Sequence, residues 1–195
     1  MRVFAMFEAP EKTMTLDEFL AFVEQQPDDG PNYELHEGEL TPVPPSKTRQ
    51  GVIAMLIGGQ ILNHVQSRKL GYVAGAHAGF KIAPKDFYAP DAAFYSHENL
   101  PDGLPADDYV AVAPDLAVEV VSTSDQATAH GKVMRYLELG TRLAWVVYPN
   151  KQTVDVYRPT DDGGVIIHTL KLDDTLQGNG VLPGFTLPVK SIFAP

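Results

Sequence analysis

The sequence predicts a mixed α/β protein, in which helices flank a sheet built mainly from valine, isoleucine and leucine. Two observations support this fold class: apolar residues recur at helical spacing in three segments, and short apolar runs suited to strands lie between and after these segments. The 16 glycines and 16 prolines are spread along the chain as turn signals, without a repeat or a low-complexity linker. We therefore expect a single domain over residues 14–195, preceded by a disordered tail at residues 1–13.

The domain is expected to begin with a helix, a hairpin and a second helix. Thr15 and Glu18 have the spacing of a capping box and precede apolar residues at helical period, which predicts a short amphipathic helix over 15–26. The alternating stretch "YELHEGELTPV" contains Glu-Gly-Glu and predicts a hairpin over 33–43. Apolar residues at helical spacing then predict a long helix over 48–69.

Gly58 and Gly59 lie in the middle of this long helix, where each glycine costs about 1 kcal/mol relative to alanine. We expect close packing against another element to be the reason for them. A later helix is predicted over 125–139, ending at Gly140, as a crossover between the strands that begin at 115 and 143. The strands are predicted at 71–82, 91–95, 115–121, 143–148, 152–158 and 164–171.

Composition and charge exclude several kinds of protein. The chain has no cysteine, which excludes disulfides, cysteine-bound zinc and thiol catalysis. The N-terminal segment has too few apolar residues for a signal peptide, and no apolar run approaches the roughly 18 residues of a membrane span, so we expect a cytoplasmic protein without membrane attachment. The net charge of -10 opposes attraction to nucleic acid, which would require a local basic surface or a bound cation.

A buried acid is predicted in the strand over 115–121. Side chains alternate along a strand, so Asp115 and Glu119 share one face. Glu119 is flanked by valines, and an ionised carboxylate left unpaired inside a covered sheet costs several kcal/mol. Its charge therefore needs compensation. Arg142, a backbone amide or an opening of this face towards water are structural explanations that the sequence leaves open.

A second acid and a lysine are predicted to lie near this carboxylate. Asp91 directly follows Pro90, and an aspartate in this position can also end a turn by bonding to the backbone two residues on. Lys132 lies on the inward-facing stripe of the helix over 125–139, which doubles back over the sheet. Its stem can therefore reach towards Glu119. A lysine that reaches solvent at the edge of the stripe is the alternative.

Two carboxylates beside an ammonium group form a recognisable chemical set. Carboxylate oxygens are hard ligands that bind Mg²⁺ or Mn²⁺, and such a metal polarises a phosphodiester and lowers the pKa of its bound water. The lysine would steady developing negative charge or orient that water. Asp91, Glu119 and Lys132 together indicate phosphodiester hydrolysis.

At these residues the sequence resembles the PD-(D/E)XK nuclease superfamily and, within it, the Uma family of restriction-endonuclease-like proteins. Pro90 and Asp91 match the PD of the motif, and Glu119 matches its second acid. The resemblance implies a restriction-endonuclease-like fold: a mixed sheet flanked by helices, with an αβββαβ core and extra C-terminal strands. It extends over most of the chain, through "YELHEGEL", "APDAAF", "APDLAVEVVSTSD", "GKVMRYLELGTRLAWVVYP" and "LPGFTLPVKSIF".

The sequence departs from the plain motif at several positions. The lysine that usually follows two residues after the second acid is replaced by Val121, so the chain is similar to those members whose lysine lies on the following helix, here Lys132. Glu34 matches the acidic position of the early "YEL…GEL" segment. Arg49 stands where many relatives carry histidine, and His130 stands where an acidic residue is common before the lysine.

The function implied by this resemblance is that of a Mg²⁺-dependent (or Mn²⁺-dependent) endonuclease that hydrolyses phosphodiester bonds of DNA, acting as a homodimer by analogy with its relatives. Asp91 and Glu119 would hold the metal, and the carbonyl of Val120 would join them. Lys132 would serve the water or the transition state, and Glu34 would assist.

Other functions compete with this one. The main alternative is a catalytically inactive nuclease fold that serves as a binding or interaction module, which the acidic composition favours; a metal-dependent hydrolase of a small phosphoester is another. The six histidines form no close pair typical of a zinc site. Gly75 and Gly79 mark a bend in a strand, not a phosphate-binding loop. Ser122 and Ser124 lack a nucleophile elbow and are expected to be helix caps.

Four pairs of basic residues are candidates for holding DNA, although each pair by itself is typical of a solvated surface. No stripe of basic and aromatic residues of the kind used by single-strand binders is visible. The pairs are Lys47 with Arg49, Arg68 with Lys69, Lys81 with Lys85, and Lys132 with Arg135.

Overall fold

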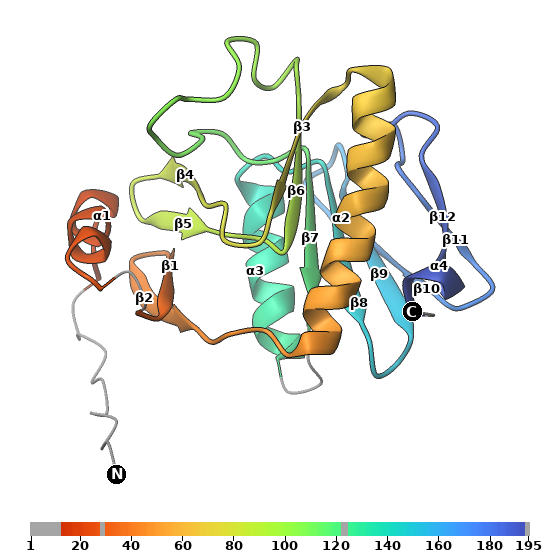
Figure 1. Ribbon diagram of the computed structural model, residues 1–195, viewed down its shortest axis with the longest axis horizontal. Coiled ribbons are helices and arrows are strands. Elements are labelled where there is room, and N and C mark those ends of the chain that lie inside the picture. Colours follow the sequence, from red (N-terminus) through yellow and green to blue (C-terminus); the bar gives the residue numbers. More distant parts are fainter. Residues whose placement is uncertain (1–12, 28–29, 122–124, 194–195) are drawn as a thin grey trace.

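A computed structural model describes residues 13–27, 30–121 and 125–193 of the chain. In these ranges it contains four helices and twelve strands. The strands form one large sheet, one small sheet and a short two-stranded ribbon (Figure 1). The predicted tail falls almost entirely outside the described ranges, as do the predicted helix caps Ser122 and Ser124. In the described ranges, no helix has both the length and the apolar character required to cross a bilayer.

The large sheet is mixed, as the sequence predicts. Only β7 and β8 are parallel neighbours, and α3 (Gln126–Glu138) crosses over between them, which confirms the predicted crossover. The other neighbours in this sheet pair antiparallel. In spatial order the strands are β10 (Val165–Leu170), β9 (Thr153–Pro159), β8 (Leu143–Tyr148), β7 (Leu116–Val120), β6 (Ala92–Ser96) and β3 (Gly71–Gly75).

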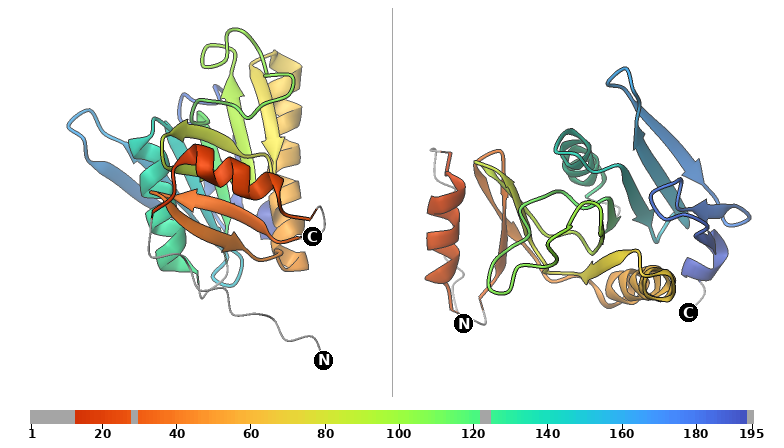
Figure 2. Two further views of the ribbon diagram at one scale, coloured as in Figure 1. Left: turned by 90° about the vertical axis from the view of Figure 1, so that its left-hand side faces the viewer. Right: turned by 90° about the horizontal axis from the view of Figure 1, so that it is seen from above.

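Two helices cover opposite faces of this sheet (Figure 2). The long helix α2 (Thr48–Arg68) packs on the face that includes Leu116 and Val118, whereas α3 packs on the face that includes Ala117 and Val121. The alternation predicted for β7 is therefore present, and Glu119 belongs to the face covered by α3. The elements α2, β3, β6, β7, α3 and β8 follow one another in the order of the expected αβββαβ core.

A small sheet lies beside the large one and carries α1 (Leu16–Glu24) on its outer side (Figure 1). The predicted capping box of α1 is present between Thr15 and Glu18. The predicted hairpin turns at Glu37 and Gly38, whose φ angles of 51° and 91° suit a two-residue hairpin turn. The strands of this sheet are, in spatial order, β2 (Glu39–Val43), β1 (Asn32–His36), β5 (Asp86–Tyr88) and β4 (Phe80–Ala83).

The prediction of a single strand over 71–82 is wrong, because the structure divides this segment between the two sheets. β3 pairs with β6 in the large sheet, whereas β4 pairs with β5 in the small one. The chain turns between them at His77, which adopts a positive φ of 70°. At Gly79 a Cβ atom would lie 2.2 Å from the ring of Phe87, so packing excludes any side chain there. The predicted bend between Gly75 and Gly79 is thus a change of sheet.

The C-terminal segment adds elements that the periodicity did not predict. β11 (Thr175–Gln177) and β12 (Thr186–Pro188) form the two-stranded ribbon, and α4 (Val189–Phe193) follows. Each is short, and their side chains join the core on the α2 face of the large sheet. The extra C-terminal strands implied by the family resemblance include this ribbon.

The expectation that Gly58 and Gly59 permit close packing is also wrong. A Cβ atom at Gly59 would meet no heavy atom within 4 Å. At Gly58 it would lie 3.7 Å from the Cβ atom of Ala92, which is an ordinary van der Waals contact. No other element of the described chain approaches these glycines closely enough to require them.

Candidate active site

Lys132 of α3 lies between two buried acids from different sheets. Its Nζ atom is 2.7 Å from Oε1 of Glu34 on β1 and 3.0 Å from Oε1 of Glu119 on β7. The carboxylates are 3% and 7% exposed as residues, and the lysine side chain is 11% exposed. The structure therefore places Lys132 on the inward side of α3, and not in the solvent at the edge of the stripe.

Asp91 reaches the same end of β7. β6 pairs antiparallel with β7 so that Ala92 lies opposite Val118, and one further residue along this register places Asp91 opposite Glu119. Oδ2 of Asp91 accepts a hydrogen bond of 2.7 Å from the backbone N–H of Val120. The partner of Asp91 is thus a distant strand, not the backbone two residues on.

The sequence left open which group compensates the charge of Glu119, and the structure shows a different partner from Arg142. Arg142 binds Asp115, with NH2 2.8 Å from Oδ1, and so serves the other acid on this face of β7. Glu119 is held by Lys132 and by the hydroxyl of Tyr136, which donates to Oε1 at 2.7 Å. Because both donors contact Oε1, the Oε2 atom of Glu119 can take a further partner.

The charges around Lys132 are unbalanced. Burial raises the pKa of Glu119 to about 7, and the negative charges of Asp91 and Glu34 act in the same direction, against the attraction of Lys132. Burial likewise raises the pKa of Asp91 above its usual range. Three acids thus lie around one lysine, and burial opposes the ionisation of two of them, Asp91 and Glu119.

Glu34 behaves differently from Glu119 although both contact the same lysine. Burial alone would raise its pKa, but Lys132 and a hydrogen bond from His36 outweigh burial and lower it to about 2. Its Oε2 lies 2.8 Å from Nε2 of His36, and its Oε1 accepts a bond of 2.9 Å from the backbone N–H of Ala89. The second donor His36 at Glu34, and the negative charges of Asp91 and Glu34 around Glu119, explain why the two pKa values move in opposite directions.

Charge and ligand type at Asp91 and Glu119 fit a divalent cation. Both are hard oxygen ligands, and a nearby cation would favour their charged forms against the burial that raises their pKa values. In the described part of the chain, no group of three or more histidine, aspartate or glutamate side chains could hold a metal ion by itself. A cation here would rest on the two carboxylates and the carbonyl of Val120, with water completing its shell as is usual for Mg²⁺.

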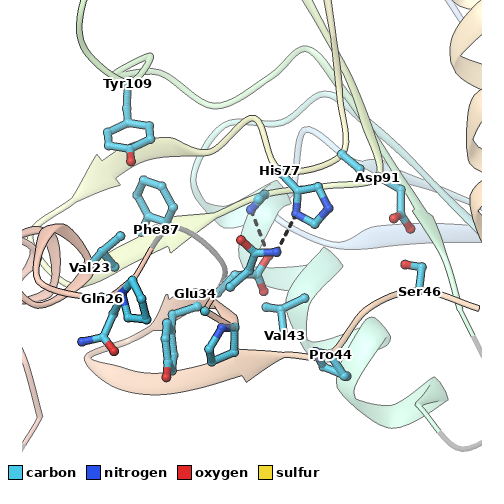
Figure 3. A pocket seen from close by; sticks show the side chains of 17 residues that line it. Val23, Gln26, Glu34, Val43, Pro44, Ser46, His77, Phe87, Asp91 and Tyr109 are labelled. Carbon is cyan, nitrogen blue, oxygen red and sulfur yellow. Dashed lines mark hydrogen bonds between the residues drawn. The ribbon is translucent and has the colours of Figure 1, made fainter.

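Two hollows meet at Asp91. The first, called here the hairpin pocket, has a volume of about 290 Å³ and is lined by Glu34 on one side and by Phe87 and Tyr109 on another (Figure 3). The second, called the helix groove, has a volume of about 590 Å³ and runs along α2. Both are lined by Asn32, Ser46, Ala76, His77 and Asp91.

Several residues around the site were missed from the sequence. His77 accepts a hydrogen bond of 3.0 Å at Nδ1 from Nδ2 of Asn32. Gln50, in the first turn of α2, donates from Nε2 to the carbonyl of Val120 at 3.2 Å. Tyr136 of α3 donates its hydroxyl hydrogen bond to Glu119. Their single positions carry no pattern, so only the tertiary contacts reveal them.

The predicted basic pair Lys81 and Lys85 is engaged by other side chains. Lys81 contacts Oδ2 of Asp108 at 2.5 Å, and Lys85 donates to the hydroxyl of Thr13 at 3.1 Å. Lysine and arginine are absent from the residues that line the two hollows within the described ranges. General attraction of phosphates is therefore weak at this entrance.

An ion pair joins the small sheet to α3 and so helps to hold Glu34 next to Lys132. Arg135 donates from NH2 to Oδ2 of Asp86 at 2.7 Å and from Nε to Oδ1 at 3.2 Å. The hydroxyl of Tyr88 also donates to Oδ1, at 3.0 Å. Arg135, proposed from the sequence as a cation for DNA, therefore has a structural partner.

Replacing Asp86 with asparagine is expected to lower the free energy of unfolding at pH 7 by about 2–3 kcal/mol, the usual cost of losing hydrogen bonds to a charged group. Burial alone would raise the pKa of Asp86, but Arg135 and Tyr88 outweigh it and lower the pKa. An acid with a lowered folded-state pKa contributes stability that is present above its unfolded pKa, near 4, and is lost as pH falls through the folded value. Urea unfolding should therefore show a difference between the two proteins that shrinks below about pH 4.

The exposed Asp161 offers a control, since its replacement by asparagine should leave stability within about 0.5 kcal/mol. A difference for Asp86→Asn that is independent of pH would contradict a role of the charged pair.

Fold and site together define a class of protein: a restriction-endonuclease-like domain, with one acid before β6, a second acid in β7 and a lysine on the following helix. The model of the Uma2 family, described as "Putative restriction endonuclease", matches residues 16–190. The chain belongs to this family.

A solved structure shows the same fold. It is described as the crystal structure of a "putative nuclease belonging to DUF820" from Anabaena variabilis ATCC 29413, and it matches with a TM-score of 0.79 at 23% sequence identity. The match covers 92% of this chain and 97% of that chain, so the likeness extends over the whole domain. Comparison with curated proteins gave no match.

Proposed function

We propose that this chain is a divalent-metal-dependent endonuclease that hydrolyses phosphodiester bonds of DNA. Mg²⁺, or Mn²⁺ in its place, would be held by Asp91, Glu119 and the carbonyl of Val120. The observation that carries the proposal is the approach of two acids and a lysine, from β6, β7 and α3, to one place beside a cleft. Membership of a nuclease family supports the reaction class, and the same resemblance suggests a homodimer.

Lys132 is suited to stabilise negative charge in such a reaction. Burial alone would lower its pKa, but Glu119 and Glu34 outweigh burial and raise it, so the ammonium group stays charged at neutral pH. It can therefore steady charge at the scissile phosphate, whereas it cannot act as a base. Glu34 is a positioning residue, because it holds the lysine at 2.7 Å while His36 and the backbone hold Glu34.

The remaining groups orient the metal ligands. When bound, the metal would polarise the phosphodiester and lower the pKa of a bound water. The N–H of Val120 fixes Asp91, and Tyr136 fixes Glu119. Gln50 holds the carbonyl of Val120, which keeps a second lone pair for a cation.

Plasmid cleavage tests the proposal. The native chain is expected to cut with Mg²⁺ or Mn²⁺ and to stop when the metal is chelated, and Asp91→Asn, Glu119→Gln and Lys132→Ala should each reduce cutting at least about a hundredfold, since a metal supplies several kcal/mol of transition-state stabilisation. Asp161→Asn is the control, because Asp161 is exposed and lies in the turn between β9 and β10.

Two results would count against this function. Metal-dependent cutting that survives all three substitutions would rule out the assigned site. Failure of every form to cut plasmid and single-stranded DNA alike, with metal present and the protein folded, would favour the inactive binding module instead.

A further inference from the structure

The glycines in the middle of α2 need an explanation that the protein's own packing does not supply. A side chain at Gly59 would extend into open space, and one at Gly58 would begin with an ordinary contact to Ala92. A Cβ atom at Gly51 would likewise meet nothing within 4 Å. Because each glycine in a helix costs about 1 kcal/mol relative to alanine, three of them along one helix are a substantial cost to stability. What they create is the space of the helix groove.

The helix groove is apolar and open. Its walls include Met55, which is 75% exposed, and Leu62, which is 38% exposed, together with Val73 on β3. Its polar groups, Asn32, Ser46 and His77, gather where it meets Asp91. An apolar hollow with a few polar groups at one end is the usual form of a ligand site. Figure 3 shows Ser46 and His77 near Asp91 at this junction.

The charge of the side chains that line the two hollows determines whether a phosphate or a base of a nucleic acid can bind there. In the described part of the chain, the charged groups that line them are Asp91 and Glu34, apart from the titratable histidine His77. Proteins that bind duplex DNA without a bound cation rely on lysine and arginine against the phosphates. An apolar groove instead fits the flat, uncharged face of a base. The helix groove is thus suited to a base, with the phosphate at the cation that Asp91 would hold.

The hairpin pocket offers a second such surface on the other side of Asp91. Tyr109, which is 38% exposed, meets the buried ring of Phe87 edge to face there, with ring centroids 4.7 Å apart, so Tyr109 presents the accessible ring. The sequence shows no aromatic stripe, and this pair is formed only in the folded chain. A phosphate bound at Asp91 would therefore have one hollow on each side. In a paired duplex the bases are stacked inside the helix and cannot enter such hollows.

We infer that the substrate strand is single-stranded or locally unpaired at the point of cleavage. One nucleoside beside the scissile phosphate lies in the helix groove against Gly58 and Gly59, and the nucleoside on the other side lies in the hairpin pocket by Phe87 and Tyr109. This inference rests on the proposed nuclease function and specifies its substrate. Contacts with the faces of the bases, and not a row of lysine and arginine side chains, would then supply the binding energy of this acidic protein.

Binding of a short fluorescent oligonucleotide, measured by anisotropy, tests the inference. Ca²⁺ replaces Mg²⁺ so that the acids are neutralised, and the same labelled strand is used alone and in a blunt duplex. The native chain is expected to bind the single strand at least about tenfold more tightly, the size of effect of one stacked base. Gly58→Leu should remove about tenfold of this affinity by filling the groove next to Ala92.

Gly58→Ala is the matched control, because its methyl group fits 3.7 Å from Ala92 and leaves the groove open. Both substitutions favour the helix, although the larger leucine must also fit beside the buried Ala92. Thermal melting of the three proteins checks this directly.

Three outcomes would overturn the inference: equal or tighter binding of the duplex, unchanged binding by Gly58→Leu, or a change of oligomeric state in that variant on sedimentation, which would make the groove a contact between copies. Plasmid cleavage separates this inference from the proposed function. If the chain binds single strands through the helix groove but cuts no DNA, the proposed nuclease function is contradicted and the binding role of the groove is supported. If it cuts DNA and prefers paired DNA, the nuclease function is supported and the single-strand inference is contradicted.

Discussion

Replacing Glu119 with glutamine is expected to lower metal-dependent cleavage at least about a hundredfold and to make the metal-free protein more stable above neutral pH. The first effect follows from the loss of a ligand charge. The second follows from burial, which raises the pKa of Glu119 to about 7 while Asp91 and Glu34 add repulsion. Glutamine keeps an oxygen for Lys132 and Tyr136 but carries no charge. A residue that costs stability and is required for activity is a common property of functional sites.

The sign of the pH dependence follows from the same shift. The unfolded pKa of a glutamate is about 4.3, below the folded value near 7, so the folded state binds the additional proton. The stability associated with protonated Glu119 is present below the unfolded pKa and is lost as pH rises through the folded pKa. The native chain should therefore lose stability relative to Glu119→Gln between about pH 4 and pH 7, by a few kcal/mol in the absence of metal.

Urea unfolding with a chelator, at several pH values, measures this difference. Added Mg²⁺ should stabilise the native chain and leave Glu119→Gln nearly unchanged, because a ligand stabilises only the folded form that binds it. Asp161→Asn, at an exposed position, should follow the native curve. A Glu119→Gln protein that is less stable than the native chain at every pH would show that this carboxylate is a structural partner of Lys132, and not a site for a cation.

Replacing Lys132 with methionine is expected to have the opposite effect on stability. The substitution retains the length of the side chain but removes the charge that compensates Glu34 and part of Glu119. Breaking a buried ion pair by removing one partner typically costs about 3–5 kcal/mol, because the remaining charge stays buried. Cleavage should be lost as well, since no ammonium group is left beside the metal ligands.

Acid should reduce this loss of stability. Without Lys132 the pKa of Glu34, held at about 2 in the native chain largely by the lysine and His36, rises. A lowered folded pKa contributes stability that is present above the unfolded value and lost as pH falls through the folded one. The difference between native and Lys132→Met proteins should thus be largest above about pH 5 and should shrink towards pH 2.

A second substitution identifies the cause. Adding Glu34→Gln to Lys132→Met removes one of the unpaired charges, so the double variant should be more stable than Lys132→Met alone. Lys171→Met, at an exposed position, is the control for loss of a lysine. If Lys132→Met unfolds in urea like the native chain at neutral pH, the lysine is not the counter-charge of these acids.

Regular elements were predicted best where the local pattern and the tertiary contacts agree. The strand expected at 143–148 matches β8, whose six residues are all buried, and the long helix expected at 48–69 matches α2 within one residue. The strand expected at 71–82 failed, because β4 forms only through pairing with β5 and a bridge from Phe80 to Val110. No local pattern records such distant partners.

The candidate site shows the same division. Asp91, Glu119 and Lys132 stand out in the sequence because each is a charged residue in a segment that must be buried. That Lys132 reaches both Glu119 and Glu34 depends on where the small sheet lies, and the pair between Arg135 and Asp86 helps to hold it there.

Local patterns were thus sufficient to predict a mixed α/β fold and the acids in it, since strand alternation and helical spacing operate over a few residues. The restriction-endonuclease-like fold was predicted from the family resemblance, and the reaction stays a prediction. Only the tertiary structure shows that Lys132 contacts two carboxylates. It also shows that the glycines of α2 border a groove, where close packing was expected. The distance between two remote segments depends on the packing of all the elements between them. A hollow forms where several elements together leave a space that no side chain fills.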